Sequence, residues 1–410
     1  MTAKRSVLAV LGLLVAALTF VVAGCGGGDG GNTLKIVSDL PLQGSDREQT
    51  AQMNLAIREV LAQADNKAGD YTIEFEEFDD STAAAGKWDE AKCAENANTY
   101  ADDSSVVGVI GTYNSGCAAI EIPILNEVSV AMVSPANTYP GLTTGGPGTE
   151  SGEPDKYYPT GTRNYARVVA NDTFQGKVDA SYMKDDLGVT KVFILDDREL
   201  YGKGVADVFE SSAKEIGLEV VGHTGWDKDA PNYTALMTQV KSTGADGIFI
   251  GGVSTNNGGQ LVKDKVSVVG DNEKVKLMVA DGFVLSTLFE EAGPDNVNGA
   301  FGSAPTKPPE QITGAGKQFF TDFEPQIPEG QTIQVYTIYA AAAAQVLLDA
   351  ISRSDGTRED VVAKLFETNL TDSVVGPLEF DANGDPRAGT ESIYSATGGN
   401  WQWKEEKAVS

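Results

Sequence analysis

The feature that most constrains the fold is a regular alternation of short apolar runs with longer helical patterns. A strand-length run followed by an amphipathic segment, repeated along the chain, predicts a parallel sheet covered by helices on both faces. In the first part of the chain the predicted strands are Leu34–Asp39, Tyr71–Phe78, Val106–Gly111 and Val130–Val133, and the predicted helices between and after them are Arg47–Ala64, Trp88–Tyr100 and Ser115–Glu127.

The same alternation resumes after a loop rich in glycine, proline and hydroxyl residues at Thr143–Asp155. The predicted second set has strands at Lys191–Asp196, Leu218–His223, Asp246–Ile250 and Lys276–Asp281, and helices from an Asp172 N-cap to Gly188, at Gly204–Ile216 and at Asn232–Ser242. Further helices are expected at Thr313–Phe323, Ile333–Ser352 and Arg358–Thr368. A chain of 410 residues is too long for one core, so we predict an α/β protein of two Rossmann-like lobes with a ligand cleft between them.

The N-terminus has the pattern of an export signal. Lys4 and Arg5 precede the uncharged apolar run Val7–Val22, which is short for a transmembrane helix. The run ends in Val22-Ala-Gly-Cys25, which resembles the bacterial lipobox. We therefore expect residues 1–24 to be a lipoprotein signal peptide, Cys25 to be lipidated and the glycine-rich residues 25–32 to be a tether. The alternative is an uncleaved anchor helix with an incidental cysteine.

Composition excludes several classes of function. The formal net charge is −28, which argues against nucleic acid as a partner. The chain has one histidine, His223, and three cysteines, so a multi-histidine or all-cysteine zinc site cannot form. His223 is expected to be structural or simply exposed. The segment Asp381–Asp385 resembles a calcium loop but lacks its glycine and glutamate, and is predicted to be a turn. No nucleophile elbow, P-loop or complete dinucleotide motif occurs, so we expect no enzyme activity, cofactor or metal.

Cysteine usage suggests one disulfide. If Cys25 is lipidated, Cys93 and Cys117 remain as a pair in an oxidising compartment. A bond between them would contribute about 3–4 kcal/mol by loop entropy. Two separate buried thiols are the alternative.

Polar residues follow several predicted strands, where ligands bind in such sheets. The turn at Ser115 opens a predicted helix, whose N–H groups and dipole would suit an anion. Thr138, Tyr201 and Asp281 follow other strands. Taken singly, each could also be an ordinary cap or turn residue.

Several stretches, in order along nearly all of the chain after residue 32, resemble the substrate-binding proteins of branched-chain amino acid ABC transporters, the type I periplasmic binding fold. They include Pro41–Gly44, Val109–Gly116, Val133–Leu142, Asp196–Gly204, Asp246–Gly252, the Tyr339-Ala-Ala helix and Gly376–Asp381. The pair Cys93 and Cys117 is similar to a disulfide of that family.

The resemblance implies a set of ligand-binding residues. Ser115, with Gly116, Ala136 and Thr138, would hold a carboxylate. Asp281, with Gly282, would face an ammonium group. Tyr201 would wall the pocket, and Tyr339 would contribute from the hinge side. Arg47 departs from the family pattern, and it would place a cation near the side-chain end of the ligand. The segment after Gly44 and the stretch Gly251–Gly259 lack aromatic residues that the family places there, so leucine specificity is not implied.

The function we expect is an extracytoplasmic, lipid-anchored receptor that captures a small zwitterion and delivers it to an ABC permease. Lobe one is expected at residues 33–162 and 301–375, and lobe two at 163–300 and 376–410, joined by a hinge of several chain crossings. A sensor of the same fold and a secreted hydrolase using carboxylates are the alternatives.

Overall fold

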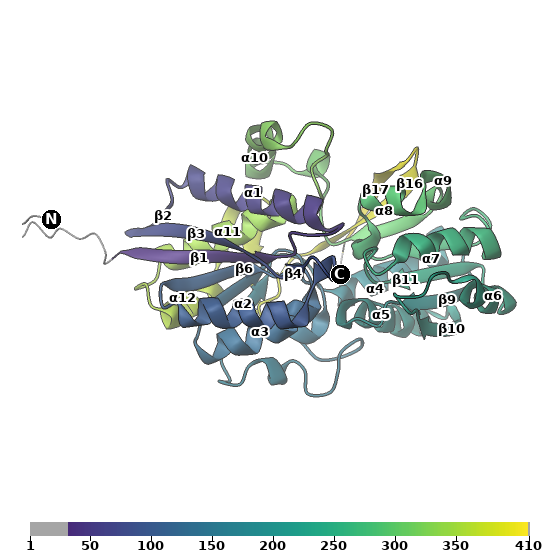
Figure 1. Ribbon diagram of the computed structural model, residues 1–410, viewed down its shortest axis with the longest axis horizontal. Helices are drawn as coiled ribbons and strands as arrows, with labels where there is room; N and C mark the ends of the chain where they lie inside the picture. Colours follow the sequence, from purple (N-terminus) through teal and green to yellow (C-terminus); the bar gives the residue numbers. More distant parts are fainter. Residues whose placement is uncertain (1–31, 409–410) are drawn as a thin grey trace, which may run out of the picture.

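Two α/β lobes lie side by side along the longest axis of the molecule, as predicted (Figure 1). The computed structural model describes residues 32–408. The expected signal peptide and the lipidated Cys25 therefore lie outside the described residues. Each lobe is built on its own sheet, and helices cover both faces of each sheet.

The sheet of lobe one has the order β2-β3-β1-β6-β7-β8, and all neighbours in it are parallel except β2 with β3. Its strands are β1 (Thr33–Leu40), β2 (Lys67–Ala68), β3 (Tyr71–Asp79), β6 (Val106–Gly111), β7 (Ala131–Ser134) and β8 (Tyr165–Arg167). The helices of this lobe are α1 (Arg47–Gln63), α2 (Glu90–Asp102), α3 (Ser115–Glu127), α10 (Ala315–Phe323), α11 (Thr337–Ser352) and α12 (Arg358–Phe366).

Alternation along the strands explains why both faces are covered. In β1, Ile36 packs in the core that contains α1 and α11, whereas the next residue, Val37, packs in the core that contains α2 and α3. Because successive strand side chains point to opposite faces, a wholly apolar strand needs a helical layer on each side. The run Val106–Gly111 is buried throughout for this reason.

The sheet of lobe two has the order β10-β9-β11-β12-β13-β16-β17. Its strands are β9 (Lys191–Asp196), β10 (Glu219–Gly225), β11 (Gly247–Gly251), β12 (Lys276–Val279), β13 (Phe301–Ala304), β16 (Thr390–Thr397) and β17 (Asn400–Ala408). The helices are α4 (Asp172–Ser181), α5 (Leu200–Ile216), α6 (Thr234–Ser242), α7 (Gly258–Asp264), α8 (Thr287–Ala292) and α9 (Pro294–Val297). The first five strands in this order are parallel, and β16 and β17 add an antiparallel hairpin that the sequence did not predict.

Two small antiparallel pairs lie outside the large sheets. They are β4 (Ser81–Thr82) with β5 (Lys87–Trp88), and β14 (Asn369–Ser373) with β15 (Gly376–Glu379). The predicted turn at Asp381–Asp385 is present, closed by the Gly384 N–H donating to the Asp381 carbonyl oxygen at 3.2 Å. The strands expected to flank it are reduced to a single bridge between Phe380 and Pro386.

The residues at which the chain crosses from one lobe to the other lie later in the sequence than expected. Strand β8 pairs with β7, so the first sheet extends beyond residue 162. Strand β13 pairs with β12, so the second sheet extends beyond residue 300. Leu378 in β15 and Phe380 just after it are still buried in the core of lobe one, and only β16 returns to lobe two. Residues 376–389 therefore do not belong to the sheet of lobe two, contrary to the expectation.

Candidate functional site

A polar and aromatic cavity lies between the lobes, where the carboxyl ends of parallel strands meet. This is the position in which open α/β sheets bind ligands. The volume of the cavity is about 30 Å³. The lining residues are Trp88, Tyr113, Asn114, Ser115, Gly116, Ala136, Thr138, Glu199, Leu200, Tyr201, Val253, Asp281, Gly282 and Tyr336.

The lobe-one side of the cavity carries the N-terminus of α3. Asn114 precedes the helix without capping it through its side chain, and Ser115 is its first residue. The Ser115 hydroxyl lies 3.4 Å from the backbone nitrogen of Tyr139, from which it accepts a hydrogen bond. The first N–H groups of a helix lack intrahelical partners and carry its positive dipole end. This side of the cavity is therefore suited to a carboxylate.

The loop that follows β7 is held against the start of α3 by two polar side chains, those of Ser134 and Asn137. The Ser134 hydroxyl accepts hydrogen bonds from the backbone N–H groups of Ala136 and Asn137, at 3.1 and 2.8 Å. The Asn137 amide in turn donates to the carbonyl oxygens of Thr112 and Tyr113, at 2.9 and 3.0 Å. These bonds join the ends of β6 and β7, so Ala136 is held beside the start of α3.

Asp281 lies on the lobe-two side and is 5% exposed. It begins the turn that follows β12. Its two carboxyl oxygens accept hydrogen bonds from the hydroxyls of Tyr201, on α5, and of Tyr336, in lobe one, the latter at 2.5 Å. Burial raises the pKa of Asp281 above its usual value, although the two tyrosine hydroxyls partly offset this effect. A cation placed in the cavity would favour the ionised form.

A second contact between the lobes closes one end of the cavity. The Lys87 ammonium group lies 2.6 Å from Oε1 of Glu199 and 2.5 Å from Oδ1 of Asn256. The Trp88 indole N–H donates to Oε2 of Glu199 at 3.3 Å. Lys87 and Trp88 belong to lobe one, and the two acceptors belong to lobe two. We call this group the Lys87 latch.

Gly116 allows the indole of Trp88 to lie directly on the start of α3. A Cβ atom added at this glycine would be 2.5 Å from the indole ring. Any larger residue would therefore displace Trp88 from the cavity wall.

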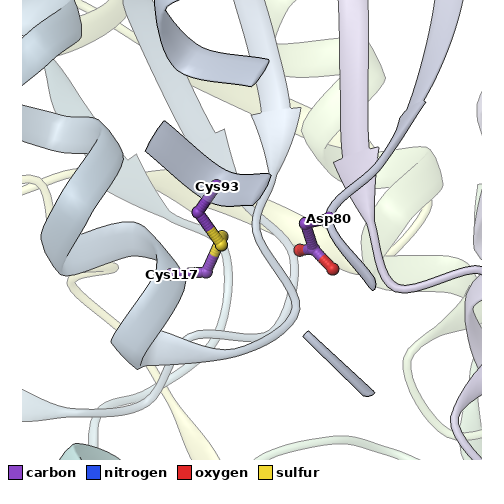
Figure 2. Close-up of side chains that lie close together, drawn as sticks. All are labelled: Asp80, Cys93 and Cys117. Carbon is purple, nitrogen blue, oxygen red and sulfur yellow. A yellow bond between two sulfur atoms is a disulfide. The ribbon is translucent and has the colours of Figure 1, made fainter. Parts of the chain in front are cut away.

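The predicted disulfide between Cys93 and Cys117 is confirmed. It joins α2 to α3, two residues after Ser115, and both sulfur atoms are buried (Figure 2). Figure 2 also shows Asp80 beside the bond. Because both sulfurs are bonded to each other, this group provides no thiolate for a metal ion.

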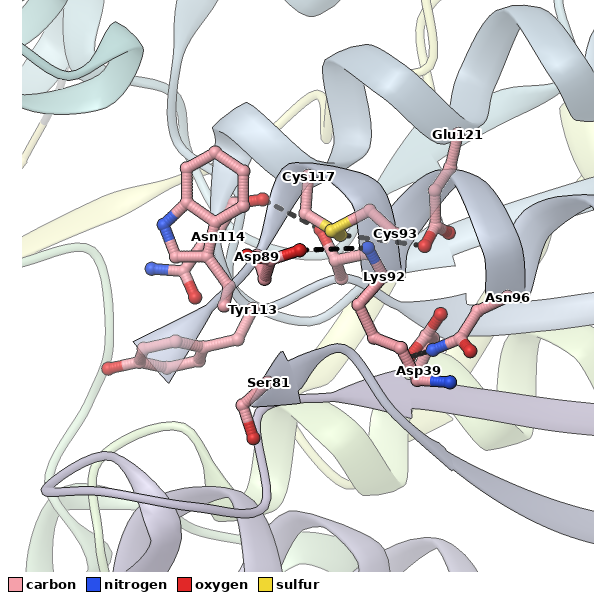
Figure 3. The surroundings of a disulfide bond; sticks show 12 residues. Asp39, Ser81, Asp89, Lys92, Cys93, Asn96, Tyr113, Asn114, Cys117 and Glu121 are labelled. Atoms are coloured by element: carbon pink, nitrogen blue, oxygen red, sulfur yellow. Dashed lines mark hydrogen bonds between the residues drawn. A yellow bond between two sulfur atoms is a disulfide. The ribbon is translucent and has the colours of Figure 1, made fainter. Parts of the chain in front are cut away.

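Two buried carboxyl groups, those of Asp39 and Glu121, lie near the disulfide (Figure 3). Asp39 accepts hydrogen bonds from the Asn96 amide at 3.1 Å and from the Tyr100 hydroxyl at 3.3 Å. Burial raises the pKa of Asp39 to about 7 and raises that of Glu121 well above its usual value. When they are protonated, these acids are neutral and do not repel an anion at the start of α3.

The structure brings seven of the nine expected ligand residues to one cavity. They are Ser115, Gly116, Ala136, Thr138, Tyr201, Asp281 and Gly282. Sequence reasoning missed the other seven lining residues, which are Trp88, Tyr113, Asn114, Glu199, Leu200, Val253 and Tyr336. Asn114 and Leu200 are chain neighbours of expected residues, and Tyr113 and Glu199 lie two positions from one. Trp88 and Tyr336 precede helices whose start was predicted too early, so they were treated as helical.

The other two expected residues lie elsewhere, which corrects the prediction. The Tyr339 hydroxyl accepts a hydrogen bond from the backbone N–H of Lys307 at 3.0 Å and is buried in lobe one. Tyr336, about one helical turn earlier, takes the place in the cavity. The Arg47 side chain is exposed and lines a separate hollow with Glu290 and Glu291. Since this hollow opens on the surface between α1 and α8, Arg47 does not reach the cavity.

Two lobes that meet around such a cavity define a bilobal solute-binding protein. Residues 33–397 match the family described as periplasmic binding protein, and the chain belongs to that family. The family consists of extracytoplasmic solute-binding proteins. Over residues 32–408, none of the helices combines the length and the hydropathy needed to span a bilayer.

Individual relatives agree with this assignment. The chain is 28% identical over 349 residues to a "Leu/Ile/Val-binding protein homolog 2" from Brucella abortus, which covers 84% of this chain and 85% of the relative. A crystal structure of a leucine-binding protein from Thermotoga maritima aligns with a TM-score of 0.78 at 21% identity, over 92% and 99% of the two chains. A solute-binding protein from R. palustris in complex with benzoate aligns with a TM-score of 0.73 at 17% identity, over 92% and 97%.

Proposed function

We propose that the protein captures an α-amino acid or a close relative between its lobes and delivers it to an ABC permease. The observation that carries the proposal is the pairing of two complementary groups across one cavity. The start of α3, with Ser115, lies on one side, and the buried carboxyl of Asp281 lies on the other. A zwitterion bound with its carboxylate at the helix start would place its ammonium group toward Asp281.

The energetics favour a charged partner for Asp281. A buried carboxylate that gains an ammonium partner forms a strong charge-assisted hydrogen bond. Removing one member of such a pair leaves an uncompensated buried charge, at a cost of about 3–5 kcal/mol. The branched-chain amino acid relatives and the leucine-binding protein of the same fold support this ligand class.

A second candidate ligand is an aromatic acid without an amine. The cavity wall contains Trp88, Tyr113, Tyr201 and Tyr336, and the benzoate complex has the same fold. In that case Asp281 would remain protonated, which agrees with the direction of its pKa shift.

Calorimetry with wild type and Asp281→Asn distinguishes the two. The titrants are a panel of amino acids, their deaminated acids and benzoates. For an amino acid receptor we expect Asp281→Asn to weaken amino acid binding by about 100-fold or more and to change the binding of deaminated acids little. Asp295→Asn, an exposed aspartate of lobe two, is the matched control. Equal affinity for amino acids and deaminated acids would contradict the ammonium role of Asp281. Turnover of any titrant would instead favour the hydrolase.

We also propose that Cys25 carries a lipid anchor, because it follows a small-residue cleavage site and precedes a glycine-rich tether. Intact-mass analysis of membrane-extracted protein should show loss of residues 1–24 and an added lipid mass. An unmodified Met1 would contradict the anchor.

Transport can be separated from sensing by reconstitution. If the ligand-loaded protein stimulates ATP hydrolysis by a permease encoded beside it, the role is delivery. Binding without such stimulation would favour a sensor.

A further inference from the structure

The only histidine of the chain lies in a cluster of carboxylates in lobe two, none of which lines the solute cavity. His223 is on β10, an edge strand, and Asp207 and Glu210 lie three residues apart on α5. Nδ1 of His223 is 2.9 Å from Oε2 of Glu210 and 3.9 Å from Oδ1 of Asp207. One ligand atom from each of these three residues lies within 4.8 Å of the others.

These separations are close to those that a tetrahedral metal ion requires. Zinc binds imidazole nitrogen and carboxylate oxygen at about 2.0–2.2 Å, which places neighbouring ligand atoms about 3.3–3.6 Å apart. The two distances from Nδ1 lie on either side of this range, so small side-chain rotations would bring all three atoms around one ion. Imidazole with carboxylates is a donor set suited to zinc and similar divalent ions.

The second nitrogen of the imidazole also has a carboxylate beside it. Nε2 of His223 lies 3.2 Å from Oδ2 of Asp196. The other oxygen of Asp196 accepts a hydrogen bond from the backbone N–H of Arg198 at 2.8 Å, which holds the carboxylate in place. A metal-binding histidine generally donates its other ring N–H to such a group, which fixes the tautomer. The contact between Nε2 and Asp196 does not have the orientation of a hydrogen bond in this structure, and a small rotation of the imidazole that aligned it would leave the lone pair of Nδ1 directed toward Glu210 and Asp207.

Two lysines hold the carboxylates without blocking them. Lys214 lies 2.6 Å from Oε1 of Glu210, and Lys203 pairs with Oδ2 of Asp207. The oxygen atoms that face His223 are the other member of each carboxylate, Oε2 and Oδ1. The side chains of Asp207, Glu210 and His223 are 31%, 24% and 16% exposed, so water can reach the cluster as a fourth ligand.

We propose that Asp207, Glu210 and His223 form a binding site for a divalent transition-metal ion of the zinc type, with Asp196 as the residue that positions the imidazole. The sequence did not predict a metal site, because His223 lies on β10 and the two carboxylates lie on α5. The site is separate from the solute cavity and does not depend on which solute is bound there. The bound ion would join α5 to the edge strand β10.

The test uses the full chain without an affinity tag, since a histidine tag would itself bind zinc. After treatment with EDTA, the protein is titrated with zinc by calorimetry and with Co²⁺ by absorption spectroscopy. We expect one ion per chain and the visible spectrum of tetrahedral Co²⁺. Glu210→Gln and His223→Gln should each weaken zinc binding by at least about 10-fold, and Asp196→Asn should weaken it by about 10- to 100-fold.

Glu219→Gln is the matched control, because Glu219 is an exposed acid on the same strand, β10. Its zinc affinity should equal that of wild type. Circular dichroism checks that each variant is folded. If His223→Gln does not fold, Glu210→Gln still tests the site. The site is refuted if wild type shows no saturable zinc binding, or if His223→Gln or Glu210→Gln binds zinc as wild type does. A thiolate charge-transfer band with Co²⁺ would place the ion at Cys25 and would also refute it.

Discussion

Reduction of the disulfide between Cys93 and Cys117 should lower the stability of lobe one by a calculable amount. The bond closes 24 residues of chain, and the loop-entropy relation assigns about 3.4 kcal/mol to a loop of this length at 25 °C. Reduction also creates a thiol at Cys117, whose sulfur lies 3.5 Å from Oε1 of Glu121. A new hydrogen bond there would return about 0.5–1.5 kcal/mol, so we expect a net loss of about 2–3 kcal/mol.

The measurement is urea unfolding of wild type with and without reductant. Reduction removes no heavy atom, so the difference reports the cross-link without the cavity that a truncated side chain would leave. The variant Cys93→Ala with Cys117→Ala is the control, and its unfolding should not respond to reductant. If the lobes unfold in separate steps, only the step of lobe one should move, because both cysteines lie in that lobe. A loss below about 1 kcal/mol would refute the loop-entropy reasoning, as would an equal response in the double variant.

Two further predictions concern the cleft and its surroundings. Burial raises the pKa of Asp46 to about 7, above its value in an unfolded chain. The contribution of Asp46 to the free energy of unfolding is therefore full at low pH and is lost as the pH rises through about 7. In urea unfolding, Asp46→Asn should be more stable than wild type by up to about 4 kcal/mol near pH 8 and equal to it near pH 4. Lys87→Met removes the contacts with Glu199 and Asn256 at 2.6 and 2.5 Å, and should lower the affinity for the preferred solute by about 10-fold by depopulating the closed form. Lys228→Met, which removes a more exposed contact with Glu199 inside lobe two, should change the affinity little; equal losses in both variants would contradict the latch.

For some helices and strands, the sequence predicted the first and last residues correctly. The bounds of β6, α3 and β9 are those expected from sequence, because uninterrupted apolar runs and a clear helix start leave few alternatives. The disulfide was expected because Cys93 and Cys117 remain as a pair once Cys25 is set aside as the lipidation site, although two separate thiols were the alternative. The positions of Ser115, Thr138, Tyr201 and Asp281 after strands followed from the alternation of strands and helices. Backbone geometry then brings such positions together at one edge of each sheet.

The predicted start of one helix, α5, was wrong because its first turns contain glycines that tertiary contacts require. Helix α5 begins at Leu200, whereas the sequence predicted a start at Gly204. A Cβ atom added at Gly204 would lie 2.5 Å from the ring of Tyr139, in the other lobe, and one at Gly202 would lie 2.6 Å from the Cα of Gly252. These glycines allow close packing and lie inside the helix. Helix propensity depends only on the local sequence, so it cannot reveal such a tertiary role.

The sequence by itself determined the two-lobed α/β class, the cleft and half of the residues that line it, because these depend on local periodicity and on the ends of strands. Only the tertiary structure decided which groups meet across the lobes. The pairing of Asp281 with Tyr336 joins residues 55 positions apart, and the Lys87 latch spans 112 positions to Glu199. Contacts of this kind depend on how two separately built sheets pack against each other, and that packing leaves no periodic signal in the chain.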